Sequence, residues 1–66
     1  MSKSEMSSYF EMLAQKISLI YGVDILDSRD AVSRSAIQIM AKENPEYVGH
    51  ISIYEWADEV YKEMFI

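Results

Sequence analysis

The feature that most constrains the fold is an apolar repeat near the end of the chain, preceded by a helix-start signal. Ser52 and Glu55 form an S-x-x-E capping box, which satisfies backbone N–H groups of a first helical turn. The apolar residues that follow recur at steps of three and four, the spacing of one helix face: Ile53, Trp56, Ala57, Val60, Tyr61, Met64 and Phe65. The sequence therefore predicts a helix over residues 53–65.

The same spacing predicts a first helix over about residues 4–21. Ser4 or Ser7 is expected to cap its start, because a serine hydroxyl accepts from the free N–H groups of the first turn. Gly22 is expected to end it, because glycine adopts the left-handed conformation that follows many helices.

A second helix is predicted over residues 28–43. Asp27 or Ser28 is expected to open it, with Asp30 completing a variant of the capping box. Its end is set by Pro45, because the residue before a proline is pushed out of the helical region. Its expected inward face is Val32, Ala36, Ile37, Ile39 and Met40.

Residues 45–51 are expected to be a connector, with a short helical turn at 46–48 or a short strand over 48–53 as alternatives. We therefore predict an all-α fold in which residues 1–66 form a single domain, a small three-helix bundle. The core predicted for this bundle is Phe10, Leu13, Ile17, Ile39, Met40, Trp56, Val60 and Met64.

The small size of the chain favours association with a second chain. A domain of this length buries only ~60% of the surface that its unfolded chain exposes. Small domains often compensate with disulfides or a metal, but the sequence has no cysteine. We therefore expect a homo-oligomer, most simply a dimer.

Catalytic, metal and cofactor sites are not expected. The sequence has two glycines and one histidine, His50, and it lacks a phosphate-binding or nucleophile motif. The spacing of Asp24, Asp27 and Asp30 does not match a calcium-binding loop.

The charge and hydropathy of the chain exclude two further classes of partner. A net charge of −5 opposes direct binding to nucleic acid or to anionic lipid surfaces. The chain has no apolar run long enough to cross a membrane and no apolar signal-peptide segment at its start. We therefore expect no membrane association and a cytoplasmic location.

The net charge is concentrated near the end of the chain. Six carboxylates and one lysine lie between residues 43 and 66, and they account for the whole net charge. On the helix predicted over 53–65, the residues placed on the polar side form an acidic face: Glu55, Asp58, Glu59 and Glu63. This face either only keeps the protein solvated or meets a basic partner, as an imitation of nucleic acid would.

The apolar side of the same helix spans about 180°, whereas packing into a bundle needs a stripe little wider than about 100°. The surplus forms an apolar edge of Tyr54, Tyr61 and Phe65. Met12 and Leu19 likewise lie on the polar side of the first helix. Because aromatic residues and methionine are enriched at interface centres, these five residues are candidate partner contacts.

Together these patterns predict a non-enzymatic, small acidic protein that binds and inhibits or regulates another protein. A nucleic-acid-binding protein with a basic surface is the most specific partner that the charge suggests. The alternative is a self-associating structural or assembly subunit whose acidic face provides only solubility. Small acidic chains without cysteine are common among regulators and inhibitors encoded by phages and mobile elements.

Overall fold

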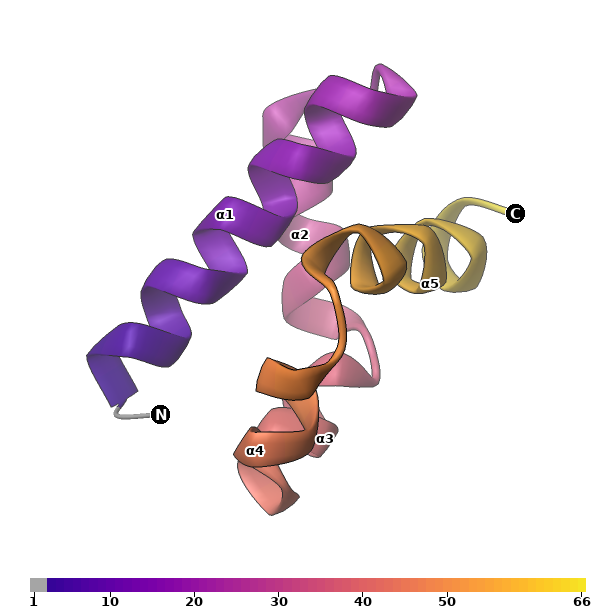
Figure 1. Ribbon diagram of the computed structural model, residues 1–66. Coiled ribbons are helices and arrows are strands. Elements are labelled where there is room, and N and C mark those ends of the chain that lie inside the picture. Colours follow the sequence, from indigo (N-terminus) through magenta and orange to yellow (C-terminus); the bar gives the residue numbers. More distant parts are fainter. Residues whose placement is uncertain (1–2) are drawn as a thin grey trace.

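The computed structural model describes residues 3–66, and five helices make up most of this part of the chain (Figure 1). In chain order they are α1 Lys3–Tyr21, α2 Ile25–Arg34, α3 Ile37–Glu43, α4 Pro45–His50 and α5 Ile53–Phe65. The predicted all-α fold, a small helical bundle, is confirmed, with five helices in place of three. The strand considered over residues 48–53 is wrong, since no strand occurs within residues 3–66.

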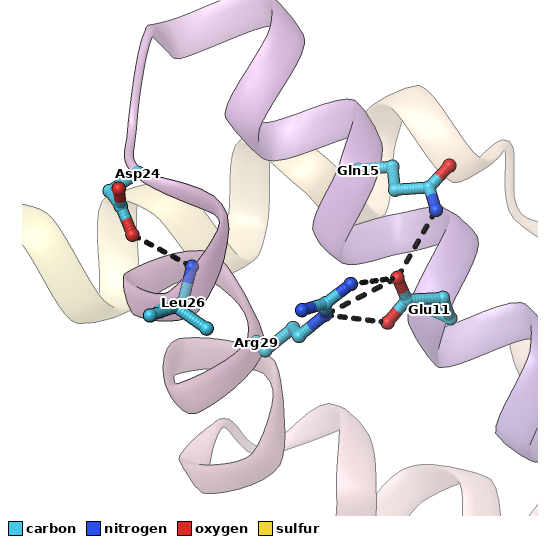
Figure 2. Close-up of polar contacts among 5 residues, drawn as sticks. All are labelled: Glu11, Gln15, Asp24, Leu26 and Arg29. Carbon is cyan, nitrogen blue, oxygen red and sulfur yellow. Dashed lines mark hydrogen bonds and ion pairs between the residues drawn. The ribbon is translucent and has the colours of Figure 1, made fainter.

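α1 and α2 form an antiparallel pair joined by a tight turn, and α5 crosses in front of α2 (Figure 1). Gly22 ends α1 as predicted, with a φ of 69° that places it in the left-handed region. Across the pair, the Arg29 guanidinium donates to both carboxylate oxygens of Glu11, with a shortest N–O distance of 2.7 Å (Figure 2). Gln15 donates to the same carboxylate at 3.1 Å. This contact joins the outer surfaces of the two helices.

The expected N-caps of the first two helices are wrong. Four residues expected to lie at helix starts lie inside the helices instead: Ser4 and Ser7 in α1, and Asp27 and Ser28 in α2. α2 begins at Ile25, and Asp24 is its cap, because the Asp24 carboxylate accepts from the Leu26 N–H at 2.9 Å (Figure 2). The cap lies upstream of the predicted position. Asp24 has the extended backbone that capping requires, with φ −54° and ψ 139°.

The core lies where α1, α2 and α5 meet, and it extends toward α3 and α4. Its buried apolar residues are Leu13, Ala14, Ile17, Ala31, Val32, Ile37, Ala41, Val48, Trp56, Ala57 and Val60. Of the predicted core, four residues are confirmed as buried: Leu13, Ile17, Trp56 and Val60. Phe10, Met40 and Met64 are half-buried at its margin, and Ile39 is wrong, since 62% of it is exposed.

The helix predicted over 28–43 is two helices, because the backbone leaves the helical conformation at Ser35. Ser35 is extended, with φ −79° and ψ 164°, and its hydroxyl donates to the Val32 carbonyl at 3.0 Å. Serine competes for helix carbonyls in this way, which weakens the helix interior. The break changes the direction in which the following residues point. Ala36 and Ile39, expected to face inward, are therefore exposed.

The connector expected over residues 45–51 is a short helix, α4, which includes the helical turn considered at 46–48. Asn44 ends α3 and caps α4, and its side-chain oxygen accepts from the Tyr47 N–H at 3.3 Å. Pro45 occupies the first turn of α4, where its missing N–H costs nothing. The bounds predicted for the last helix are confirmed, and the Ser52 hydroxyl caps it by accepting from the Tyr54 N–H at 3.2 Å.

Candidate protein-binding surface

The three aromatic residues of the predicted apolar edge lie along α5, but the middle one is engaged within the chain. Tyr61 is half-buried, and its ring stacks on that of Tyr21 with centroids 4.0 Å apart and an interplanar angle of 7°. Phe65 continues the stack, with its centroid 5.5 Å from that of Tyr61. Tyr54, by contrast, is 58% exposed. The edge therefore offers a partner its two ends, Tyr54 and the outer side of Phe65.

Met12 and Leu19 lie apart from that edge. Both side chains are exposed, 52% for Met12 and 80% for Leu19, whereas Leu13 and Ile17 of the same helix are buried against the core. Both residues are therefore exposed as predicted, on the outer side of α1. Leu19 lines an open hollow with Ile25, at the turn between α1 and α2.

Of the four carboxylates on the acidic face, Glu55 and Glu59 are the two without a direct polar contact among the described residues, although the charge of Lys62 acts on Glu59. Both are exposed, and neither makes a hydrogen bond or ion pair with any residue of the described chain. They lie one turn apart on α5, which places their Cβ atoms about 5–6 Å from each other. These two carboxylates carry the negative charge that a partner would meet.

Asp58 is half-buried and has two partners inside the chain. Its carboxylate accepts from the Lys62 ammonium at 2.9 Å and from the Tyr21 hydroxyl at 3.2 Å. The bonded Lys62 ammonium holds the pKa of Asp58 below its usual value. Partial burial, followed by the negative charge of Asp58, raises the pKa of Tyr21. Asp58 and Lys62 therefore neutralise each other, and the hydrogen bond from Tyr21 to Asp58 joins α5 to the end of α1.

Glu63 has a structural contact that its sequence position did not indicate. Both of its carboxylate oxygens accept from the backbone N–H of Ala36, at 3.2 Å each. Ala36 is the N-cap residue of α3 and has no polar side chain of its own. Glu63 therefore supplies the missing cap from α5, and its charge also suits the positive end of α3.

A groove of about 600 Å³ lies along the first half of α5. Apolar and aromatic side chains from three helices line it, namely Met40 of α3, Tyr47 of α4, Tyr54 and Trp56 of α5, and Ile51 just after α4. Glu55, Asp58 and Glu59 complete its lining. The groove therefore brings Tyr54 of the predicted apolar edge together with Glu55 and Glu59 of the acidic face.

The short helix α4 gives the groove its aromatic wall. Trp56 is only 6% exposed, and its indole Nε1–H donates to the Val48 carbonyl of α4 at 3.0 Å. The Tyr47 ring meets the indole edge to face, with centroids 6.2 Å apart. Tyr47, Met40 and Ile51 were not predicted as site residues. The Asn44–Pro45 pair, a recognised helix-start signal, would have indicated α4.

Tyr54 already binds a cation within the chain. The Lys16 ammonium of α1 lies 5.5 Å from the centroid of the Tyr54 ring. This distance is within the range in which a cation is attracted to the electron-rich face of an aromatic ring. The rim of the groove thus has chemistry that suits positive charge in its aromatic rings as well as in its carboxylates.

The rest of the described chain offers little other chemistry. His50 is exposed at the end of α4. No group of three histidine or acidic side chains within the described residues is arranged to hold a metal ion. None of the helices described is long and apolar enough to cross a membrane. Comparison of the chain with protein-family models, with curated proteins and with solved structures finds no significant match.

Proposed function

We propose that this chain is a non-enzymatic cytoplasmic protein that binds another protein with a basic surface and thereby inhibits or regulates it. One observation carries the proposal: the groove along α5 brings exposed aromatic surface together with Glu55 and Glu59, two exposed carboxylates with no hydrogen bond or ion pair to the described residues. Such a surface suits a nucleic-acid-binding protein, whose phosphate-binding side chains would meet these carboxylates.

The two parts of the groove have separate roles in this proposal. Aromatic side chains in a concave surface bury area at low cost in side-chain entropy, so they determine how long a complex lasts. Unpaired carboxylates at the rim attract a basic partner over a distance, so they determine how fast it arrives. Asp58 contributes less to this attraction because it pairs with Lys62. Glu63 keeps its charge, but it binds the Ala36 N–H and lies outside the groove lining.

The test is charge reversal with a matched control. A partner is first captured from cytosol with the wild-type chain, and its binding rates are then measured at two ionic strengths. Glu55→Lys with Glu59→Lys should slow association, and the loss should shrink as salt screens the charges over a Debye length of ~10 Å at about 0.1 M. Asp27→Lys with Glu43→Lys is the control, because it changes the net charge equally at exposed residues outside the groove lining. Equal slowing by both pairs would contradict the proposal.

Self-association is the second candidate function, and exposed leucines at the turn between α1 and α2 favour it. Leu19 is 80% exposed and Leu26 is 67% exposed, and Leu19 shares a hollow with Ile25. A second copy that covered these residues would bury apolar surface that a single copy leaves in water. Sedimentation equilibrium across the micromolar range distinguishes the two candidates, because a single 7.7 kDa species would exclude this one.

A further inference from the structure

The lining of the groove divides into an acidic part and an aromatic part. Glu55 and Glu59 are exposed carboxylates one helical turn apart. Tyr47, Tyr54 and Trp56 supply aromatic surface within the same groove. A ligand that fills it must therefore combine positive charge with a flat or apolar surface.

An arginine side chain meets both requirements better than a lysine. Its guanidinium has five N–H donors in a planar fork, which can reach two carboxylates at once, and its flat face stacks on aromatic rings. Related contacts occur within the chain, one between an arginine and a single carboxylate and one between a lysine ammonium and a tyrosine ring. Arg29 forms a forked contact with Glu11, and Tyr54 holds the Lys16 ammonium over its ring.

The volume of the groove indicates that the arginine belongs to a polypeptide. A volume of about 600 Å³ holds more than one side chain. Met40 and Ile51 line it as well, and they offer contacts to apolar neighbours of the arginine. The occupant that fits is a segment in which an arginine lies beside apolar residues.

A second copy of this chain is a poor source of that arginine. Arg29 already pairs with Glu11, and Arg34 lies 3.8 Å from Asp30. These are the only arginines in the sequence, and the net charge of −5 makes two copies repel each other. The charge therefore favours a different, basic protein.

From this complementarity we propose that the groove binds an arginine, flanked by apolar residues, on the surface of the partner protein. The guanidinium bridges Glu55 and Glu59 and stacks on the aromatic rim, while the flanking residues contact Met40 and Ile51. This assignment rests on the proposed function, and it specifies which side chain of the partner the groove recognises.

The test uses three synthetic peptides with blocked ends, identical except at one residue placed between two leucines. That residue is arginine, lysine or citrulline, which keeps the shape of arginine without its charge. Binding is followed by the fluorescence of Trp56, the single tryptophan of the chain, and by backbone amide chemical shifts. The arginine peptide should bind about fivefold more tightly than the citrulline peptide, the difference expected for two exposed ion pairs. Its shift changes should map to α4 and the first half of α5.

Matched variants assign the effect to the carboxylates. Glu59→Gln removes a charge without changing the shape of the side chain, and it should reduce the preference for arginine over citrulline. Glu43→Gln removes the same charge from an exposed residue outside the groove lining, and it should leave that preference unchanged.

Three results would overturn the assignment: equal affinity for the arginine and citrulline peptides, lysine binding as tightly as arginine, or shift changes centred on Met12 and Leu19. Failure here is distinguishable from failure of the proposed function. If the captured partner is lost on reversal of Glu55 and Glu59 while the peptides bind alike, the function stands and the arginine assignment falls. If the peptides are discriminated and charge reversal slows no partner, the function falls.

Discussion

Replacement of Trp56 by alanine should remove most of the stability of the domain. Trp56 is 6% exposed in the core, and truncation of a buried tryptophan costs about 3–5 kcal/mol. A stability of about 0.05–0.15 kcal/mol per residue gives this 66-residue chain about 3–10 kcal/mol in total. Trp56→Phe should cost less, about 1–3 kcal/mol, because it retains a ring but leaves the Val48 carbonyl without its donor.

Urea denaturation followed by far-UV circular dichroism measures both losses. Ile39→Ala is the matched control, because Ile39 is a large apolar residue that is exposed, and its truncation should change the free energy of unfolding by at most about 0.5 kcal/mol. If Trp56→Ala unfolds cooperatively within about 1 kcal/mol of the wild type, then Trp56 does not join α5 to α4, and the reasoning fails.

Four further predictions concern other parts of the chain. Gly22→Ala should destabilise the domain by about 1–2 kcal/mol, because the φ of 69° is strained for alanine. An added Cβ would meet no other atom, so the strain alone accounts for the loss. A thermal melt measures this loss, and an unchanged melting temperature would contradict the prediction. Glu63→Ala should cost about 1 kcal/mol in urea denaturation, through loss of the cap on Ala36. The bonded Arg29 guanidinium holds the pKa of Glu11 below its usual value of 4.5. The Glu11–Arg29 pair therefore stabilises the fold fully above pH 4.5, and this stabilisation is lost as the pH falls through the lowered pKa of Glu11. The difference in unfolding free energy between wild type and Arg29→Gln should therefore narrow in acid, and a constant difference would refute the linkage. Finally, Phe65→Glu should lower the association state in sedimentation equilibrium if the outer side of Phe65 lies in a contact between two copies.

The sequence predicted helices best where the signal was local. The bounds of α5 followed from a capping serine and an apolar repeat, both contained within residues 52–65. The end of α1 followed from Gly22 for the same reason. The break between α2 and α3 was not predicted, because Ser35 lies within an otherwise helical apolar pattern and the cap of α3 comes from a carboxylate of α5 far along the chain.

The candidate surface was predictable only in part. Tyr54, Glu55 and Glu59 were identified because exposure on one helix follows from its spacing. Asp58 and Glu63 lie on the same helix, but Tyr21 and Ala36, which donate to them, come from other elements, and no single-helix argument reveals those contacts. The Asp58–Lys62 pair, by contrast, has the i,i+4 spacing that a single helix predicts. To predict that Met40, Tyr47 and Ile51 line the groove, one would need to know the direction in which α4 runs relative to α5.

The shortness of α3 and α4 has a consequence for the proposed surface. These helices have seven and six residues, whereas isolated helices shorter than ~12–15 residues are marginal in water. They pack mainly on each other, and the bond from Trp56 to Val48 joins α4 to α5. This end of the molecule should open as a unit without global unfolding, and its amide protons should exchange with solvent before those of α1. Only the closed population has a complete groove, so the affinity measured for a ligand would be lowered by the open fraction. A substitution that raises the closed population should tighten binding without touching the ligand.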